Sequence, residues 1–400
     1  MKEFKIRKMM NKKLVALLIC MVSVFTFAQA QYESKIVVKG TVVDARTGEP
    51  VSFANVGVLG TVLGVASDMD GRFELVVPYK CAAHDIRISA IGYRSFDMKV
   101  YEGQDKPDLQ IKMEPVSYGI KEVDVYGELL VYKKMLRNVV DNISKNYIDQ
   151  PYNYDGYFKY VIACNGVEKI KEAVVTIYDA EGYNRENPEV AFQDICYKYN
   201  QVRRSEQPES VLDGLTALDD VLTADVVRNT RNVLDIVNSR DYKLQNKGKL
   251  IYEGDSVQVI GYTAVKPSLS TTGDPTVKTY TGEIYINLKD FAVLKNVTYI
   301  ASNDFNALGR NLVTVGEAQK NNVKMTITTT YKKLRDIYFL SGVNFDYSYQ
   351  EEGKEIEGKM EFITTKIQIE SPTPIEGRTY YEDIKENQDF WNQYSAYFEE

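Results

Sequence analysis

The chain has 400 residues, of which 44% are hydrophobic, and this length and composition suggest two or three domains that each bury a core. Its formal net charge is −7, and a negative surface repels phosphate backbones and anionic headgroups, which argues against a nucleic-acid-binding protein. After residue 30, no stretch reaches the ~20 consecutive apolar residues of a membrane helix.

Residues 1–30 predict a signal peptide. Six basic residues precede an apolar run over 14–27, and Ala28-Gln29-Ala30 has the small-x-small pattern of a cleavage site. We therefore expect an exported protein that begins at Gln31 and is periplasmic or associated with the outer membrane. Removing the six basic residues and one acid of the signal takes the formal charge from −7 to −12.

Residues 31–115 predict a β-sandwich. Hydrophobic residues alternate along this region, and turn signals such as those at 46–50 and 68–71 recur between the alternating runs. About seven short strands with this spacing are typical of a sandwich rather than of βαβ units.

Five motifs in this region occur in a characteristic order: Gly40-Thr41-Val42-Val43-Asp44, Gly48-Glu49-Pro50-Val51, Ala54-Asn55-Val56, Asp70-Gly71-Arg72-Phe73 and Ile91-Gly92-Tyr93. Over about residues 36–114 the chain resembles the carboxypeptidase regulatory-like domain, a transthyretin-like sandwich common in exported envelope proteins of Bacteroidota. The resemblance implies an accessory module without catalytic residues. Outer-membrane receptors with this module continue into a plug and a transmembrane barrel, for which this chain is too short.

The remaining chain predicts three further segments. Residues 116–150 read as a linker and an amphipathic helix, which the turn before Pro151 ends. Residues 151–370 predict an antiparallel β domain with two helices at about 205–239, and residues 371–400 an acidic, aromatic tail that packs back on the body. The hairpins of the β domain are expected to turn near Asn165-Gly166, Gly254-Asp255, Lys289-Asp290, Asn321-Asn322 and Glu352-Gly353.

The predicted fold class is therefore mainly β: a seven-stranded sandwich, a short helical connector and a large antiparallel sheet with a helical insert. Such a sheet, curled around the helices at 205–239, would be similar to the half-barrels of periplasmic lipoprotein carriers. That likeness is a fold-level analogy and implies no activity on its own.

The single histidine, His84, limits the chemistry. A Ser-His-Asp triad needs an oriented imidazole, zinc proteases need two or three, and the chain has no HExxH motif. Metallocarboxypeptidase activity is therefore excluded by ligand count, and His84 is interpreted as a solvated turn residue. No GxSxG, Walker or GxGxxG pattern is present either.

The acidic clusters in the sequence do not indicate a metal-binding or catalytic site either. The motif at 68–71 begins like a calcium loop, but Arg72, Phe73 and Tyr79 occupy positions where that loop needs a ligand, a glycine and a glutamate. We interpret it as a turn that uses Asp-Gly. The pairs Asp219-Asp220, Glu351-Glu352 and Glu399-Glu400 read as solvated surface.

Cysteines and tyrosines complete the candidates. Cys20 lacks the preceding small residue of a lipobox, whereas Cys164 and Cys196 could pair if their strands were neighbours, and Cys81 would then remain single. The tyrosines on predicted strands could stack on sugars or line an apolar cavity, or could simply suit half-buried strands: Tyr280, Tyr285, Tyr299, Tyr331, Tyr347 and Tyr349.

The sequence favours an exported, non-catalytic envelope protein that acts as an accessory binding or interaction module. Its partner could be an envelope protein, a glycan or an apolar ligand, but not a nucleic acid. One alternative is a periplasmic carrier that holds an apolar ligand in the curved sheet, and a second is a carboxylate-dependent glycan hydrolase. No catalytic, cofactor-binding or metal-binding residue is predicted.

Overall fold

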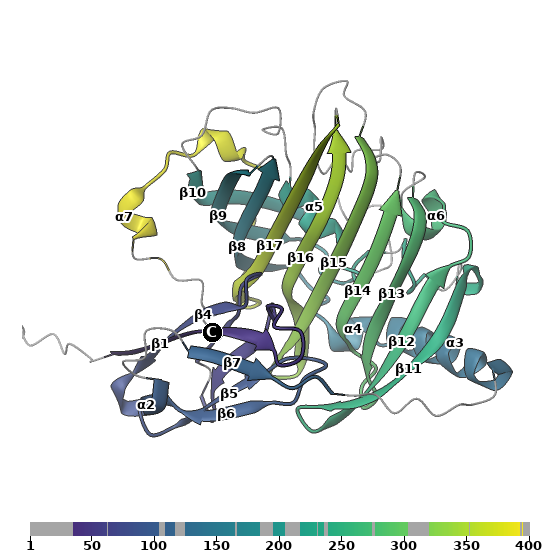
Figure 1. Cartoon of the computed structure of the whole chain (residues 1–400), viewed down its shortest axis with the longest axis horizontal. Coiled ribbons are helices and arrows are strands. Elements are labelled where there is room, and N and C mark those ends of the chain that lie inside the picture. The colour runs from purple at the N-terminus through teal and green to yellow at the C-terminus, as the bar shows by residue number, and fades with distance from the viewer. Residues whose placement is uncertain are drawn as a thin grey trace, which may run out of the picture.

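The computed structural model consists of a small N-terminal β region followed by one large antiparallel sheet (Figure 1). The predicted mainly-β class is confirmed. The residues that the structure describes are 35–61, 63–103, 109–116, 125–164, 166–184, 195–204, 217–229, 231–235, 239–273, 277–302, 320–351, 353–392 and 394. The predicted signal at 1–30 lies outside them.

The N-terminal region is a seven-stranded sandwich, as expected. One sheet has the order β4-β1-β7, from Arg72–Pro78, Lys35–Asp44 and Leu109–Met113. The other has the order β3-β2-β5-β6, from Gly64–Ala66, Asn55–Val58, Asp85–Ser89 and Phe96–Lys99. Burial alternates along β1, β2 and β4, so every second side chain enters a shared core that includes Val56, Leu75 and Ile88. A helix, α2 (Val100–Gly103), follows β6.

The large sheet has ten strands in the order β10-β9-β8-β17-β16-β15-β14-β13-β12-β11, and adjacent strands are antiparallel throughout. Its connections are mostly the hairpins read from the sequence, since the chain turns near Gly166, Gly254 and Gly353, all at positive φ. The strands are β8 (Tyr152–Cys164), β9 (Val167–Asp179), β10 (Ile195–Arg204), β11 (Tyr242–Tyr252), β12 (Asp255–Ala264), β13 (Val277–Asn287), β14 (Val293–Ser302), β15 (Lys320–Leu334), β16 (Ile337–Glu351) and β17 (Lys354–Gln368).

One expected hairpin turn is wrong. Asn321-Asn322 lies inside β15, where the register with β16 shifts between Asn321 and Lys324 and Asn322 takes a φ of 56°. The pair therefore forms a bulge in a continuing strand, because a left-handed asparagine fits a bulge as well as a turn. Residues 312–319, expected as the preceding strand, lie outside the described part of the chain.

Helices cover one face of the large sheet (Figure 1). They are α3 (Val125–Asp141), α4 (Ile143–Asn146) and α5 (Ala217–Thr223), which contact β11, β16 and β17. The apolar stripe of α3, including Leu136 and Val139, joins the main core. Shorter helical elements lie elsewhere: η1 (Tyr79–Cys81), η2 (Ser239–Asp241), α6 (Leu269–Thr272), η3 (Tyr381–Asp383) and α7 (Gln388–Trp391).

The second helix predicted within 205–239 is not found in its described residues. Residues 225–229 and 231–235 form turns instead, because polar side chains bind nearby backbone N–H groups that a helix would use. Asp225 Oδ1 accepts from the N–H of Val227 at 3.0 Å, and Asn232 Oδ1 accepts from that of Leu234 at 2.8 Å. Residues 205–216 and 236–238 lie outside the described chain.

Beneath α5 and these turns, the described part of the sheet face is filled with side chains. The rings of Tyr147 and Tyr183 are tilted by 34° with centroids 5.0 Å apart, and Tyr331 meets Tyr147 edge-on at 5.6 Å. Asp225 accepts from the hydroxyls of Tyr183 (2.7 Å) and Tyr331 (2.6 Å). Buried hydroxyls and a buried carboxylate therefore satisfy one another here, as a stable core requires.

The sandwich docks on the opposite face of the large sheet, near one end of β15, β16 and β17 (Figure 1). Phe53, held at a φ of 58°, points its ring at Gly342 of β16, where an added Cβ would come within 2.5 Å of the ring. The side chain of Ser67 fixes the Phe53 loop, accepting from the N–H of Ala54 at 2.8 Å and donating to the carbonyl of Val51 at 2.7 Å. The missing side chain of Gly342 thus makes the socket for the ring.

Candidate ligand-binding cleft

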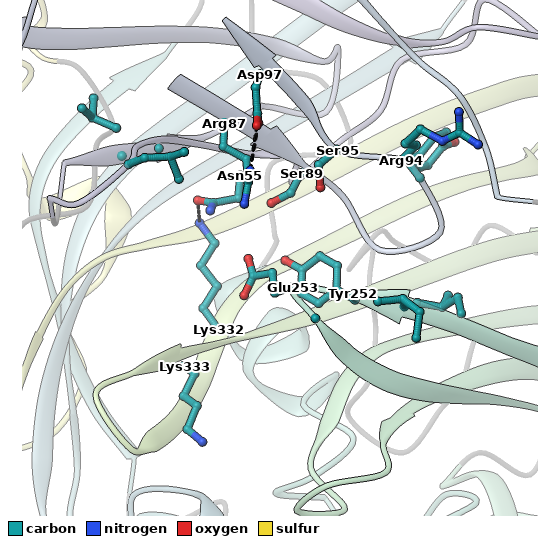
Figure 2. A pocket seen from close by; sticks show the side chains of 18 of the residues that line it. Asn55, Arg87, Ser89, Arg94, Ser95, Asp97, Tyr252, Glu253, Lys332 and Lys333 are labelled. Atoms are coloured by element: carbon teal, nitrogen blue, oxygen red, sulfur yellow. Dashed lines mark hydrogen bonds and ion pairs between the residues drawn. The ribbon is translucent and has the colours of Figure 1, made fainter. Parts of the chain in front are cut away.

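A cleft of about 1260 Å³ lies between the sandwich and the large sheet (Figure 2). On the sandwich side its walls come from β2, β3, β5 and β6, and on the other side from the β11–β12 and β15–β16 hairpins. Because its two walls belong to different β regions, docking of those regions creates the cleft. It is large enough for a small-molecule ligand.

Glycines form part of the sandwich wall. Gly57 of β2 pairs directly with Gly64 of β3, and both face the cleft rather than the sandwich core. A Cβ added at Gly57 would meet no atom closer than 3.8 Å. The space in front of Gly57 therefore exists because no side chain occupies it. At Gly64 a Cβ would crowd the Val56 carbonyl at 3.2 Å, so this glycine allows the two strands to approach closely.

An ion pair between Arg87 and Asp97 links two strands of the same wall. Arg87 on β5 donates from Nε and Nη2 to the two carboxylate oxygens of Asp97 on β6, at 2.8 and 2.7 Å. The hydrogen bond from Arg87 lowers the pKa of Asp97, which keeps this carboxylate ionised. Asp97 is therefore committed to its partner.

Lys332 of β15 enters the cleft from the opposite wall (Figure 2). Its Nζ donates to Oδ1 of Asn55 at 3.0 Å, a neutral acceptor on β2. Burial lowers the pKa of Lys332 to about 8, although the negative charge of Glu253 opposes this shift. The ammonium is thus a partly desolvated positive charge at the junction of the two regions.

Positive charge prevails around the cleft. Its lining includes five cationic residues, Arg87, Arg94, Lys249, Lys332 and Lys333, and two anionic ones, Asp97 and Glu253. This balance contrasts with the formal charge of −7 for the whole chain. Lys333 turns away from Lys332 toward Asp290, whose Oδ2 lies 3.5 Å from its Nζ.

Apolar side chains make up much of the remaining lining. Ile251 on β11 is 62% exposed and Leu59 is 38% exposed, although large aliphatic side chains usually lie inside. Leu63, Tyr252 and Phe339 continue this apolar surface into the cleft. The cleft thus combines an apolar wall with a positively charged ammonium group.

A smaller cleft of about 510 Å³ lies where the sandwich, the large sheet and the tail meet. Glu172 accepts from the Tyr157 hydroxyl at 2.5 Å and from Nε of Arg203 at 2.6 Å. The Arg203 guanidinium in turn lies 4.9 Å above the ring of Trp391. These groups satisfy one another, so we interpret them as the attachment of the tail.

The interface beside the smaller cleft holds a buried carboxyl group near Asp68 and Tyr157. Glu361 of β17 is 0% exposed, and neither of its oxygens has a hydrogen-bond partner within the described residues. Burial raises its pKa well above 4.5, and Asp68 and Asp70 add to the rise, while Lys159 and the nearby backbone N–H of Met69 oppose it. Its cross-strand neighbour Asn344 also has an unpartnered Oδ1 in that part of the chain.

The residues singled out in the sequence lie elsewhere. His84 is exposed in a turn, and Asp68 to Gly71 form the expected turn, with Gly71 at a φ of 74°. Asp219 is not simply solvated, since it pairs with Arg378 at 3.1 Å, and Glu351 is buried, because strand pairing carries it inside. Asp220, Glu352, Glu399 and Glu400 lie outside the described side chains.

The cysteines do not pair in the structure. Cys81, Cys164 and Cys196 are free thiols, and β9 lies between the strands of Cys164 and Cys196. Five of the six strand tyrosines are buried, which favours the interpretation that they suit half-buried strands, whereas Tyr299 is 48% exposed.

The described residues contain neither a cluster of metal-binding side chains nor a helix suited to a membrane. No group of three or more His, Cys, Asp or Glu side chains in them could hold a metal ion. None of the helices in that part of the chain combines the length and apolar character needed to cross a bilayer.

Sequence reasoning missed the cleft residues. Lys332 looked like one of many polar residues on a strand, and the glycines at 57, 60 and 64 had no recognised motif. A usable signal was present, because two glycines that interrupt Val-rich strands indicate close approach or open space in front of them.

The molecule is thus a two-part β protein with a ligand-sized cleft at the junction. Residues 38–125 match the family model for the CarboxypepD_reg-like domain, which confirms the resemblance of the sandwich. The chain is also similar to the TonB-dependent receptor SusC of Bacteroides thetaiotaomicron, with 37% identity over 117 residues. That match covers 28% of this chain and only 11% of the receptor.

Solved structures give weaker likenesses. The LolA superfamily protein NE2245 from Nitrosomonas europaea aligns over 60% of this chain and 94% of its own, with 10% identity and a TM-score of 0.24. A putative outer membrane lipoprotein-sorting protein domain from Vibrio parahaemolyticus aligns over the same shares, with 8% identity and a TM-score of 0.26. A putative membrane-associated protein from Bacteroides fragilis covers 84% of this chain and 98% of its own, with 10% identity and a TM-score of 0.16.

Proposed function

We propose that this chain is an exported cell-envelope protein that binds an apolar ligand in the cleft between the sandwich and the large sheet, without turning it over. The single observation that carries the proposal is the cleft itself, about 1260 Å³ between two docked regions and walled in part by apolar side chains. The signal at 1–30 and the stretch shared with SusC support the envelope location.

This proposal places the ligand of the carrier alternative at the domain junction rather than under the helices. The described face beneath α5 is occupied by packed tyrosines and aliphatic side chains. The cleft has room in front of Gly57, together with exposed Ile251 and Leu59. An apolar ligand would be stabilised by covering these side chains.

Binding without turnover is the simpler chemistry for this lining. A glycan hydrolase needs two carboxyl groups placed on either side of the scissile bond. Of the two acids that line the cleft, Asp97 is held by both donors of Arg87. Neither acid is therefore presented with a free carboxyl partner for acid–base work.

The test uses N-phenyl-1-naphthylamine, a neutral apolar dye whose fluorescence rises in an apolar site. Gly57→Phe fills the cleft, because its Cβ has open space and the ring extends over the wall. We expect this change to weaken dye binding by about ten-fold or more, as for other losses of a bound apolar group. Val167→Phe, at an exposed position at the start of β9, is the matched control and should bind normally.

Two results would count against the proposal. One is a folded Gly57→Phe protein, with an unchanged thermal unfolding midpoint, that still binds the dye as wild type does. The other is the absence of dye uptake by wild type, which would favour a protein or glycan as the occupant.

A further inference from the structure

The ammonium of Lys332 has an unusual set of partners for a cation at an interface. Its hydrogen bond goes to Asn55 Oδ1, a neutral oxygen, at 3.0 Å, and it forms no ion pair within the described residues. Burying a cation without a carboxylate partner is costly, so such a position is generally completed by an anion. The neighbouring Lys333 is not in this state, since it pairs with Asp290.

A second polar group on the facing wall is buried beside it. Ser89 of β5 is 2% exposed, and its Oγ has no partner at full hydrogen-bond geometry in the described part of the chain, although burial raises the pKa of Tyr252 and the nearby Ser89 hydroxyl opposes this rise. Ser89 pairs directly across the strands with Asn55, so the two side chains lie next to each other on the face that lines the cleft. An amide, a hydroxyl and an ammonium therefore converge at one end of the cleft (Figure 2).

The charge around this point does not supply the missing anion. Asp97 is bound by Arg87, and Glu253 is an exposed residue beyond the ion-pair distance of Lys332. Arg94 and Lys249 add two exposed cations at the rim, and neither forms an ion pair within the described residues. An incoming anion would thus meet an uncompensated positive field, which the low polarity of the walls strengthens.

Apolar surface begins next to this polar group. Leu59 and Leu63 lie on the sandwich wall, and Ile251, Tyr252 and Phe339 lie on the wall of the large sheet. A ligand that reaches from Lys332 along these side chains would have a charged end and an apolar chain. Neither a free inorganic ion nor an uncharged hydrocarbon would use both parts of the cleft.

We propose that the cleft binds single-chain amphiphiles with an anionic head group, and that Lys332, Asn55 and Ser89 hold the head while the apolar walls hold the chain. This assignment rests on the proposed function, because it names the ligand class of the same cleft. The shared chemistry is an oxyanion, a carboxylate or a phosphate monoester, on an alkyl chain. Lys332 provides the charge, and Ser89 provides a hydroxyl donor.

The experiment compares ligands of one chain length: dodecanoate, dodecyl phosphate and 1-dodecanol, each displacing N-phenyl-1-naphthylamine from the purified protein at pH 7. Wild type should bind at least one anion about ten-fold more tightly than the alcohol, as expected for a charge-assisted contact in a partly desolvated site. The tighter of the two anions identifies the head group. Equal binding of the alcohol and both anions would overturn the proposal.

Variants then locate the contact. Lys332→Met keeps the chain length but removes the charge, so it should abolish the preference for the anion over the alcohol. Lys332→Arg should retain the preference, and Lys249→Met, which changes an exposed rim cation, should shift it only slightly. If Lys332→Met weakens the dye, the alcohol and the anions equally, Lys332 has only a structural role and the assignment is wrong.

The two proposals fail in different ways. Absence of dye binding in wild type contradicts the apolar cleft itself. Dye binding that Gly57→Phe blocks, together with no preference for anions, leaves the apolar cleft in place and removes only the head-group site.

Discussion

The two faces of the large sheet are both covered, but they are built differently. On the face under the helices, two buried carboxylates are matched: Asp179 accepts two hydrogen bonds from Arg228, both at 2.8 Å, and Asp225 accepts from two tyrosines. On the face under the sandwich, Glu361 and the Oδ1 of Asn344 have no partners within the described residues. Lys332 on the same face bonds only to a neutral amide.

This difference separates a folding core from an interface. Unmatched buried polar groups lower stability, by about 1–3 kcal/mol each, so a chain keeps them only where another requirement outweighs the loss. The helix-covered face also holds polar atoms without a hydrogen-bond partner in the described residues, Thr329 Oγ1 and one oxygen of Glu351, but its buried charges Asp179 and Arg228 form an ion pair. Glu361 and Lys332 on the sandwich-covered face form no ion pair within those residues. The comparison teaches that burial alone does not distinguish core from interface, and that the pairing of buried charges does.

Breaking the matched core should have the largest effect. Asp179→Ala leaves the Arg228 guanidinium buried without its carboxylate, and removing one partner of a buried pair costs about 3–5 kcal/mol of unfolding free energy. Urea unfolding measures the loss. Glu74→Ala, which breaks the exposed pair with Lys39, is the control and should change little. A small loss for Asp179→Ala would show that the helix-covered face is not the matched core described here.

The next largest effect concerns the docking of the sandwich. Phe53→Ala removes a buried ring from its socket at Gly342 and should cost roughly 3–4 kcal/mol of unfolding free energy, the lower part of the range for a buried phenylalanine. Gly342→Val should destabilise the protein by itself, because its Cβ would overlap the ring. In the double variant the overlap disappears, so the two losses should be clearly less than additive. Strict additivity in urea unfolding would mean that the two residues are not in contact in solution.

Glu361→Gln should act in the opposite direction and stabilise the protein at neutral pH by about 1–3 kcal/mol, because the neutral amide cannot take on the buried negative charge that burial disfavours in the carboxyl group. The pKa of Glu361 is higher in the folded than in the unfolded chain, so the folded state binds more protons. Stability of the wild type should therefore fall as the pH rises from about 4.5 toward the raised pKa.

The pH profile of unfolding checks this sign. Asp68 faces Glu361 from the sandwich and also has a raised pKa, so it contributes a slope of the same sign, while Lys159 opposes both. Glu361→Gln should flatten most of the decline, and Asp346→Asn, at an exposed strand position, should not. A decline of unchanged steepness in Glu361→Gln would contradict the role given to this carboxyl.

The smallest effect is expected at the cleft wall. The pair of Arg87 and Asp97 is about half exposed, and exposed pairs contribute about 0–1 kcal/mol. Asp97→Ala should thus lower the unfolding free energy by no more than that, as thermal unfolding can confirm. A loss as large as that of Asp179→Ala would place this pair in the core rather than at a solvent-filled cleft.

Much of the fold could be predicted from local signals. Asn165-Gly166 and Glu352-Gly353 sit between alternating runs, and both supply a left-handed glycine to a two-residue turn. The ordered motifs of the sandwich were equally local. Predictions failed where a local signal has two solutions: Asn321-Asn322 became a bulge, and the apolar spacing near Val233 did not form a helix because Asp225 and Asn232 bind the backbone.

The cleft was not predictable by the same means. Gly57, Ser89 and Lys332 come from segments far apart in the sequence, and their meeting depends on how the sandwich docks on the large sheet. No period of two or 3.6 residues encodes a contact between two separately formed surfaces. The sequence shows only that Gly57 and Gly64 lack side chains. That this leaves space for a cleft becomes clear only when the facing wall from the large sheet is known.

The chain after β17 has a consequence for how the protein behaves in solution. It returns to strand β10, the end of the sheet order, where the N–H of Tyr197 donates to Gly377 at 3.3 Å and the N–H of Thr379 donates to Tyr197 at 3.1 Å. The Trp391 indole then donates to the carbonyl of Val202 at 2.8 Å. A bare edge strand recruits strands of other molecules, so this returning segment acts as a guard against edge-to-edge aggregation.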